Sequence, residues 1–266
     1  MRSVFLLALV GCTSPTAPEP AGDHYAYTID HLNVPANNTQ ARDDGFDLNG
    51  DGTIDNQLGQ VFGTMDGLGI DCTGATAHAV ADGMIALGID LQTTAFDEAA
   101  AAGFTTSASS GAALAGTAED GTFTLGPGTV SIAIAVADPK LVVPIDLTDA
   151  HVTLTGVDAS GIAHGVIAGG VTPENLRDDF FPALAVAFDD IVKRDCTGSG
   201  SLCGCADGSS GRLLVDYFDY PTADCTITAD EIAANALTAS LFAPDLAIAG
   251  QKVVSFGVGF SATRRN

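Results

Sequence analysis

Strict alternation of large apolar residues with small ones marks two segments of this chain as β-strands. Every second residue is Val or Ile in residues 130–136, and every second residue is Val or Phe in residues 254–260. Successive side chains of a strand point to opposite faces, so each segment presents one apolar face that has to be buried. Residues 25–29 repeat the pattern. The fold is therefore expected to be built on half-buried strands.

Residues 151–168 are expected to form a β-hairpin, because two apolar segments flank an Asp-Ala-Ser-Gly turn. With Val157 opposite Ile162, His151 and His164 lie on one face, four residues apart along the strands. At ~3.3 Å per residue they are about 13 Å apart, too far for one metal ion or a proton relay. We expect both histidines on the solvent side.

Helical spacing of apolar residues identifies four further segments, residues 54–65, 77–85, 172–191 and 228–241. The third starts at Thr172, and Pro182 is expected to kink or split it. Residues 213–217 are expected to form another strand. Short strands with several helices and no regular βα alternation predict an α+β fold, with a β-rich antiparallel sheet or sandwich and about four packed helices.

The first twelve residues have the pattern of a cleavable export signal. Arg2 supplies a positive charge, and residues 4–10 are apolar but too few to span a bilayer. The run Leu-Val-Gly-Cys that ends at Cys12 resembles the bacterial lipobox. The resemblance implies a signal peptide over residues 1–11, lipidation of Cys12 and, with Thr13 in place of Asp, sorting to the outer membrane. An ordinary signal peptide with an incidental Cys is the alternative.

Residues 12–22 carry three prolines and no apolar periodicity, which is typical of a semi-extended tether. No other stretch approaches 18 apolar residues, so the chain is expected to meet the membrane of the bacterial cell envelope through acyl chains alone. Residues 23–266 are expected to form a single β-rich extracytoplasmic domain.

The charge balance excludes some partners. The chain has 33 acidic and 10 basic side chains, a net charge of −23, and 28 of the acids are Asp. Binding phosphate backbones or anionic headgroups requires clustered Lys and Arg, so no nucleic-acid partner is expected. Hydrophobic residues make up 46% of the chain, which is enough for a sizeable core.

Oxygen-bearing side chains occupy every second position of residues 47–55, and Gly52 stands sixth in the run. They are Asp47, Asn49, Asp51, Thr53 and Asp55. Calcium prefers six to eight oxygen ligands, and a tight loop turns these residues inward if the sixth residue takes a positive φ. The run resembles the calcium loop of EF-hand, dockerin and thrombospondin type-3 repeats, which implies Ca²⁺ as the ligand.

The twelfth position departs from that resemblance, because Leu58 stands where an EF-hand has a bidentate Glu. The departure predicts weak binding, with Kd about 10⁻⁴ to 10⁻³ M, or a completing ligand from Asp43, Asp44 or Asp66. Residues 35–45 are a poor entering helix, so a loop followed by one helix is expected. The alternative is an ion-free turn that caps the next helix.

A weaker second site is considered in residues 218–232, where Asp219, Asp224 and Glu231 resemble part of an EF loop. Cys225 replaces the glycine of the sharp turn, and Thr228 and Glu231 form a capping box. A structural relic is favoured over a working calcium site.

Four cysteines, Cys196, Cys203, Cys205 and Cys225, fall within 30 residues, and Cys72 lies apart. In an oxidising compartment such a cluster is expected to form two disulfides, with three connectivities open. Zinc is the alternative, although the paired knuckles of zinc sites are missing. Cys72 is expected to be a spare, buried or free.

No catalytic motif was found, so an enzyme is not expected. We expect an exported, lipid-anchored calcium-binding lipoprotein with a structural or binding role, whose partner is an envelope protein or a polysaccharide. A calcium-dependent hydrolase or carbohydrate-binding protein is the alternative, although Trp is absent and aromatic residues are only 6%. An envelope assembly factor, which would expose a large apolar surface, is a third hypothesis.

Overall fold

The computed structural model of the chain describes residues 20–67, 69–109, 113–221 and 223–265. The expected signal peptide, the lipidated Cys12 and most of the tether lie outside the described residues.

The described chain contains a ten-stranded antiparallel sheet, as the α+β prediction requires. Its strands are β1 (Asp23–Asn33), β2 (Gly88–Thr93), β3 (Ala100–Thr106), β4 (Leu114–Glu119), β5 (Thr122–Leu125), β6 (Thr129–Val136), β7 (Asp138–Asp158), β8 (Gly161–Val171), β9 (Leu246–Ile248) and β10 (Gln251–Arg264).

The sheet closes on itself, because β1 pairs with β2 on one side and with β10 on the other. The order β1-β2-β3-β4-β5-β7-β8-β10 therefore returns to β1, and every neighbouring pair is antiparallel. We call these strands the closed sheet. Each strand of the circuit therefore has a neighbour on both sides. Of the two expected arrangements, a sheet or a sandwich, the described chain forms a single closed sheet.

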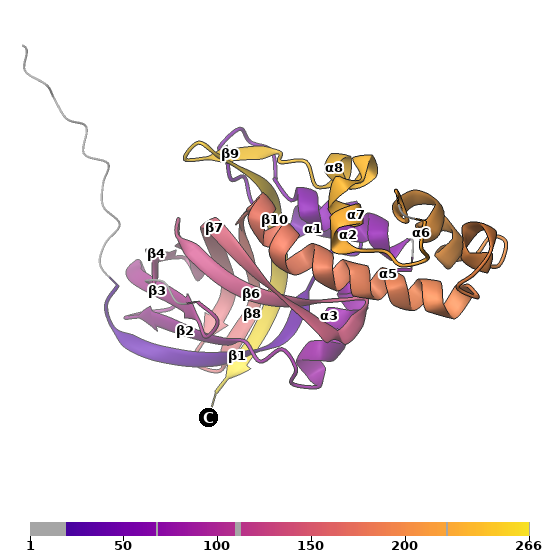
Figure 1. Ribbon diagram of the computed structural model, residues 1–266. Coiled ribbons are helices and arrows are strands. Elements are labelled where there is room, and N and C mark those ends of the chain that lie inside the picture. The colour runs from indigo at the N-terminus through magenta and orange to yellow at the C-terminus, as the bar shows by residue number, and fades with distance from the viewer. Residues whose placement is uncertain (1–19, 68, 110–112, 222, 266) are drawn as a thin grey trace, which may run out of the picture.

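The predicted hairpin is confirmed in its register. Val157 of β7 pairs with Ile162 of β8, and His151 pairs with Ala168. Strand β7 continues well beyond the hairpin, and its first half pairs with β6 outside the circuit. Figure 1 shows this β6–β7 ribbon projecting between α5 above and α3 below.

Apolar side chains fill the closed sheet. Tyr27, Phe104, Phe123 and Phe256 are fully buried there, on strands that alternate inward and outward residues. The Tyr27 hydroxyl donates to the Asp158 carbonyl at 2.8 Å. Burial raises the pKa of Tyr27 to about 12, so it remains a neutral phenol.

All the helices of the described chain lie between β1 and β10 in the sequence. They are α1 (Asn38–Asp43), α2 (Gln57–Asp66), α3 (Cys72–Ala81), α4 (Pro173–Asn175), α5 (Phe181–Asp195), α6 (Ser210–Phe218), α7 (Ala229–Ala234) and α8 (Ala236–Leu241). The four longest are α2, α3, α5 and α6, with ten, ten, fifteen and nine residues.

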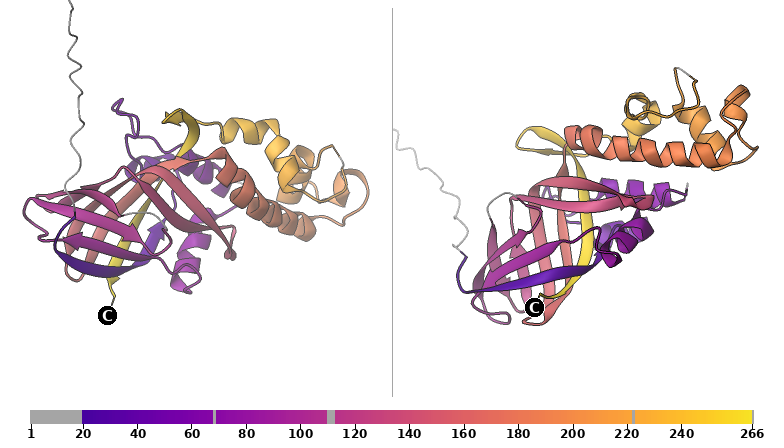
Figure 2. Two further views of the ribbon diagram at one scale, coloured as in Figure 1. Left: turned by 60° about the vertical axis from the view of Figure 1, so that its left-hand side comes forward. Right: turned by 60° about the horizontal axis from the view of Figure 1, so that its bottom comes forward.

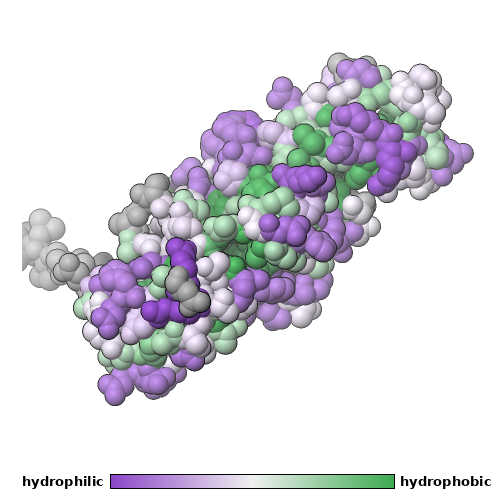
Figure 3. Space-filling model, turned by 90° about the horizontal axis from the view of Figure 1, so that it is seen from below, coloured by the Kyte–Doolittle hydropathy of each residue, from purple (hydrophilic) through white to green (hydrophobic). Residues whose placement is uncertain are grey.

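Helices α5 to α8 gather beyond one end of the closed sheet, while the C-terminus lies at the other end (Figures 1 and 2). Phe62 of α2 connects the closed sheet to the helices beyond its end. Its ring packs against Phe256 of β10 and against Phe180, which directly precedes α5. On the face drawn in Figure 3, hydrophobic residues gather along the middle of the molecule, between more hydrophilic ends.

The irregularity expected at Pro182 takes the form of a π-helical turn within a helical segment that runs without a break over residues 173–195. Thr172 caps the segment by accepting from the Asn175 amide, and a π-helical turn, Leu176–Phe180, then separates α4 from α5. Pro182 lies in the first turn of α5, where its missing N–H costs least.

The prediction of a strand at residues 213–217 was wrong, because these residues lie in α6. Ser209 caps this helix by accepting from the Arg212 amide, and Leu214 and Val215 are buried while Leu213 and Tyr217 are exposed. This burial follows the three-to-four-residue spacing of a helix, not alternation.

Three smaller expectations also need correction. The final helix begins at Thr228 but breaks at Asn235, whose ψ of 134° ends α7 and whose side chain caps α8. A short helix, α1, does precede the acidic loop, capped by Asn37. His151 is half-buried, because Phe46 stacks on its ring at 4.7 Å between centroids, whereas His164 is exposed as expected.

Candidate metal centre

The acidic loop predicted to bind calcium connects α1 to α2 and lies against β10. Its ends are joined by an antiparallel bridge between Phe46 and Asp55, in which the Asp55 amide donates to the Phe46 carbonyl at 2.9 Å. Asn56 follows directly and caps α2 by accepting from the Gly59 amide. The loop is thus fixed at both ends to regular structure.

Asp47 organises the loop. Its carboxylate accepts from the amides of Gly50 at 2.8 Å, Asp51 at 3.0 Å and Gly52 at 2.8 Å. Gly52, the sixth residue, has a φ of +86°, and Gly50 has a φ of +74°. The positive φ expected at the sixth position is therefore present, at a position where glycine has no Cβ to oppose it.

The middle of the loop is held by further hydrogen bonds from backbone amides to side-chain oxygens, each between residues two positions apart. Asn49 Oδ1 accepts from the Asp51 amide at 2.9 Å, and Asp51 Oδ1 accepts from the Thr53 amide at 2.8 Å. The hydrogen bonds from the Thr53 amide and hydroxyl, followed by that from Asn49, lower the pKa of Asp51. Asp51 is therefore anionic at neutral pH.

The pKa of Asp55 is shifted in the opposite direction to that of Asp51. Its Oδ2 accepts from the Leu48 amide at 2.9 Å, but partial burial raises its pKa, and repulsion from Asp245 and Asp51 adds to the rise. Asp245 precedes β9 and is not among the residues predicted from the sequence. It lies almost 200 positions from the loop, and no local pattern connects the two.

Asp245 is itself fastened to the sheet. Its carboxylate accepts from the Ser255 amide at 2.8 Å and from the Ser255 hydroxyl at 2.5 Å, and the same hydroxyl accepts from the Gln57 amide at 2.7 Å. Ser255 of β10 therefore connects Asp245 to the first residue of α2, directly after the loop.

The three proposed completing ligands do not lie in the loop. Asp43 is exposed at the end of α1, and Asp66 is at the end of α2 farthest from the loop. Asp44 is buried and accepts from the Asn33 side chain on the outside of the closed sheet. Leu58, at the twelfth position, is fully buried in the core and leaves that position without an oxygen donor.

The donor chemistry of the loop fits a hard cation. Carboxylate, amide and backbone oxygens are the ligands that calcium prefers, and the loop supplies them from Asp47, Asn49, Asp51, Thr53 and Asp55. Its carboxylates do not converge within 4.8 Å: among the described residues, only Cys203, Asp219 and Cys225 bring three such ligand atoms that close.

That second group coincides with the weaker predicted site and is structural. Asp219 is buried, and its carboxylate accepts from the amides of Asp224 at 3.0 Å and Cys225 at 2.9 Å. Cys225 takes a φ of +70°, the conformation that glycine has in an EF loop. Glu231 accepts from the Thr228 amide and hydroxyl as the predicted capping box.

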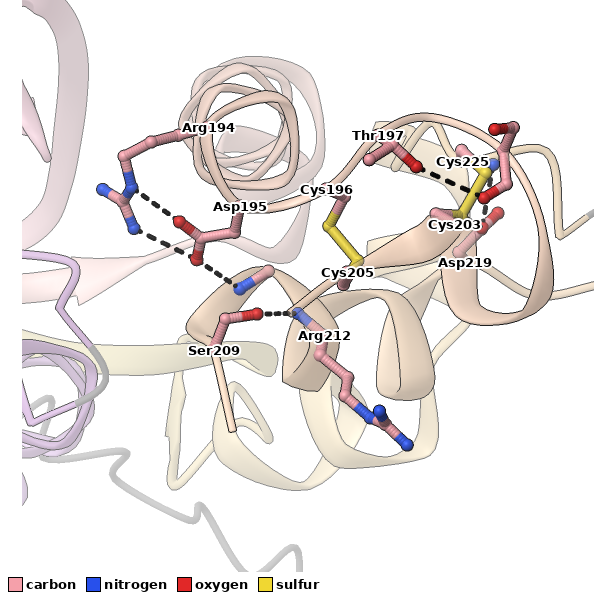
Figure 4. The surroundings of a disulfide bond; sticks show 12 residues. Arg194, Asp195, Cys196, Thr197, Cys203, Cys205, Ser209, Arg212, Asp219 and Cys225 are labelled. Carbon is pink, nitrogen blue, oxygen red and sulfur yellow. Dashed lines mark hydrogen bonds and ion pairs between the residues drawn. A yellow bond between two sulfur atoms is a disulfide. The ribbon is translucent and has the colours of Figure 1, made fainter. Parts of the chain in front are cut away.

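Two disulfides form in the cysteine cluster, as expected. They join Cys196 to Cys205 and Cys203 to Cys225, so these sulfurs are not thiolate ligands for zinc. In Figure 4 the Asp195 carboxylate also joins α5 to α6, since it accepts from Arg194 and from the Gly211 amide at 2.9 Å. The bridges fasten the helical end of the molecule.

The helical end also contains an apolar cavity of about 230 Å³ between α2, α5, α6 and α8. Phe188, Leu214, Leu241 and Phe242 are among its walls, and Tyr217 lies at its exposed side. A space with this lining suits apolar groups better than polar ones.

The fold and the loop define an α+β protein whose closed antiparallel sheet carries an acidic, EF-like turn. No protein-family model, curated protein or solved structure matches this chain. Within the described ranges, no helix is both long enough and apolar enough to cross a membrane.

Proposed function

We propose that this chain is an exported, lipid-anchored calcium-binding lipoprotein of the bacterial cell envelope with a structural or binding role. The observation that carries the proposal is the Asp47 carboxylate, which accepts from three successive loop amides and turns the loop around itself. A turn already folded in this way needs little further ordering before its oxygens bind a cation.

Electrostatics support a cation at the same place. Asp245 and Asp51 both repel the Asp55 carboxylate, which adds to the rise in its pKa that partial burial causes. With a net charge of −23 the chain offers few cations of its own, and none of the ion pairs among the described residues involves these three acids. A bound Ca²⁺ supplies the missing positive charge.

The ion's proposed role is to strengthen the junction of α1, α2 and β10. Asn56 and Gln57, directly after the loop, are hydrogen-bonded to Gly257 and Ser255 of β10. Stabilising the loop therefore stabilises the start of α2 on the sheet. The export and lipid-anchor parts of the proposal depend on the N-terminal motif that ends at Cys12.

The alternative of a carbohydrate-binding protein or hydrolase has less support. Phe46 is the aromatic residue at the start of the loop, and His151 already covers one face of its ring. A sugar-stacking platform needs an open aromatic face. We therefore keep the structural or binding role.

Thermal unfolding of the purified chain in calcium and in EDTA tests the proposal. Calcium at ten to a hundred times its Kd should stabilise the protein by about 1–3 kcal/mol. The double substitution Asp47→Ala with Asp51→Ala should abolish that gain. A matched control, Asp23→Ala with Asp216→Ala, removes two exposed acids elsewhere and should keep it. Identical melts in calcium and EDTA would refute calcium binding.

A further inference from the structure

A cavity of about 200 Å³ lies on the outer face of the closed sheet, between β1, β8, β10 and the end of α1. We call it the outer-face pocket. Its polar lining consists of His31, Asn33, Asp44, His164 and Ser261. It is separate from the acidic loop, which begins three residues after Asp44.

Asp44 is the fixed part of this pocket. It is only 4% exposed, and its Oδ2 accepts from the Asn33 side-chain amide. Its Oδ1 lies over Gly259 of β10 and has no hydrogen-bond partner among the described residues. Gly259 allows this approach, because a Cβ at that position would collide with the carboxylate. One oxygen of a buried carboxylate is thus left facing the cavity.

Two histidines, His31 and His164, line the same pocket. His31 of β1 pairs with Ser261 of β10, and His164 lies on β8, the strand on the other side of β10. Neighbouring strands are 4.7–4.9 Å apart, so the backbones that carry the two histidines are separated by about 10 Å. Both histidines are exposed and make no hydrogen bond with a described residue, so both rings are free to turn.

The electrostatics of the pocket favour a cation. Burial raises the pKa of Asp44, and the hydrogen bond from Asn33, followed by attraction to His164 on β8, partly lowers it again. Asp43, the adjacent acid, adds negative potential. An anionic ligand would be repelled, and the lining is too polar for an apolar one.

We propose that the outer-face pocket binds one divalent transition-metal ion, such as Zn²⁺, through His31, His164 and Asp44. Two imidazoles and a carboxylate suit such a metal better than calcium, which prefers oxygen ligands. In the conformation described, the three groups do not lie within 4.8 Å of one another. Binding therefore turns the two exposed imidazoles toward Asp44, which Asn33 holds in place.

Calorimetric titration of the untagged full chain with Zn²⁺, in saturating calcium, tests the proposal, and Co²⁺ absorption reports ligand type. We expect one ion per chain. His31→Ala and His164→Ala should each weaken binding by about tenfold or more. Both residues are exposed, so the fold should survive, and circular dichroism verifies this. His78→Ala, an exposed histidine on α3, is the control and should bind as the unmodified chain does.

Other outcomes separate this pocket from the other acidic and sulfur-rich sites. Asp51→Ala should remove the calcium response and leave Zn²⁺ binding intact. Zn²⁺ binding that disappears in Asp51→Ala, or that persists in both histidine variants, would place the ion elsewhere and overturn the proposal. No binding at millimolar Zn²⁺ would also overturn it, while leaving the calcium proposal untouched.

Discussion

Asn56 and Gly257 exchange two hydrogen bonds, both 3.0 Å long, although they are 201 positions apart in the chain. The Asn56 amide group donates to the Gly257 carbonyl, and its Oδ1 accepts from the Gly257 N–H. The same side chain also donates to the Ala41 carbonyl and caps α2 at Gly59. One buried amide therefore joins α1, α2 and β10 directly beneath the acidic loop.

Asn56→Ala should be strongly destabilising, because it leaves the buried polar groups of Gly257 without partners and removes a helix cap. Each unpaired buried group costs about 1–3 kcal/mol, so a total loss of roughly 3 kcal/mol or more is expected in urea unfolding. Asn37→Ala removes only the exposed cap of α1 and should cost about 1 kcal/mol. Equal losses in the two variants would contradict this assignment.

The raised pKa of Asp55 predicts a specific pH dependence. A carboxyl whose pKa is higher in the folded state contributes stability below its unfolded pKa and loses it as the pH rises through the folded value. In EDTA the contribution of Asp55 to stability should therefore be lost as the pH rises from about 4, and the difference between the unmodified chain and Asp55→Asn isolates it. Asp55→Asn should raise the thermal midpoint at pH 7 in EDTA and remove the gain from calcium.

Asp51→Asn is the control, because it should change the thermal midpoint in the opposite direction to Asp55→Asn. The pKa of Asp51 is lowered, so its charged form contributes stability above the unfolded pKa, and this contribution is lost in the Asn variant. Its thermal midpoint at pH 7 in EDTA should fall slightly. Two midpoints that move in the same direction would show that the loop carboxylates do not repel one another as described.

The outer edge of β6 is capped by side chains from elsewhere in the fold. The Thr76 hydroxyl on α3 accepts from the Ala135 amide at 2.9 Å and donates to its carbonyl at 3.3 Å. Ser109 and Thr106 do the same for Ser131. These bonds replace the partner strand that β6 lacks on that side and protect an edge that could pair with another chain.

Thr76→Val keeps the shape of the side chain but removes both bonds to the buried Ala135. A loss of about 2–3 kcal/mol and a greater tendency to aggregate are expected, measured by urea unfolding and light scattering. Thr64→Val on α2, where the hydroxyl bonds to its own exposed helix, should change stability by less than about 0.5 kcal/mol. A similar small change at Thr76 would show that the cap is dispensable.

Thiol titration should separate Cys72 from the other cysteines. Burial raises the pKa of its thiol to about 12, so it should not react in the native protein. With Cys12 replaced by Ala, the unreduced chain should show one thiol in denaturant, and the same chain with Cys72→Ala added should show none. Four or five thiols would contradict the two disulfides.

Local patterns were sufficient to predict much of this fold. Alternation located β6 and β10, and two apolar segments around a turn located the β7–β8 hairpin. The expectation that β10 is buried on one face only was wrong: residues 253–260 are all buried, because Asp44, Asn56 and Gln57 cover its outer face. The prediction of a strand at residues 213–217 failed, because a short apolar run is compatible with either a strand or a helix. The outcome there depends on the Ser209 cap and on Leu214 and Val215, which face the core in α6.

The acidic loop could be predicted for a similar reason, since its oxygens and its Gly52 lie within nine residues. Asp245 could not, because only the folded sheet brings it to Asp55. Asp44 was grouped with the loop by proximity in the sequence. The α1 helix instead ends with this side chain directed to Asn33 on β1.

The closure of the sheet by β1 and β10 has a consequence for how the protein is made. More than 200 residues separate those strands in the sequence, so the last circuit contact waits until β10 has been synthesised. Until then β1 and β8 both present open edges, and the most long-range contacts form last, which slows folding. An open edge on β1 or β8 can pair with another molecule, so β10 is both the last strand of the circuit to form and the one that removes this risk of aggregation.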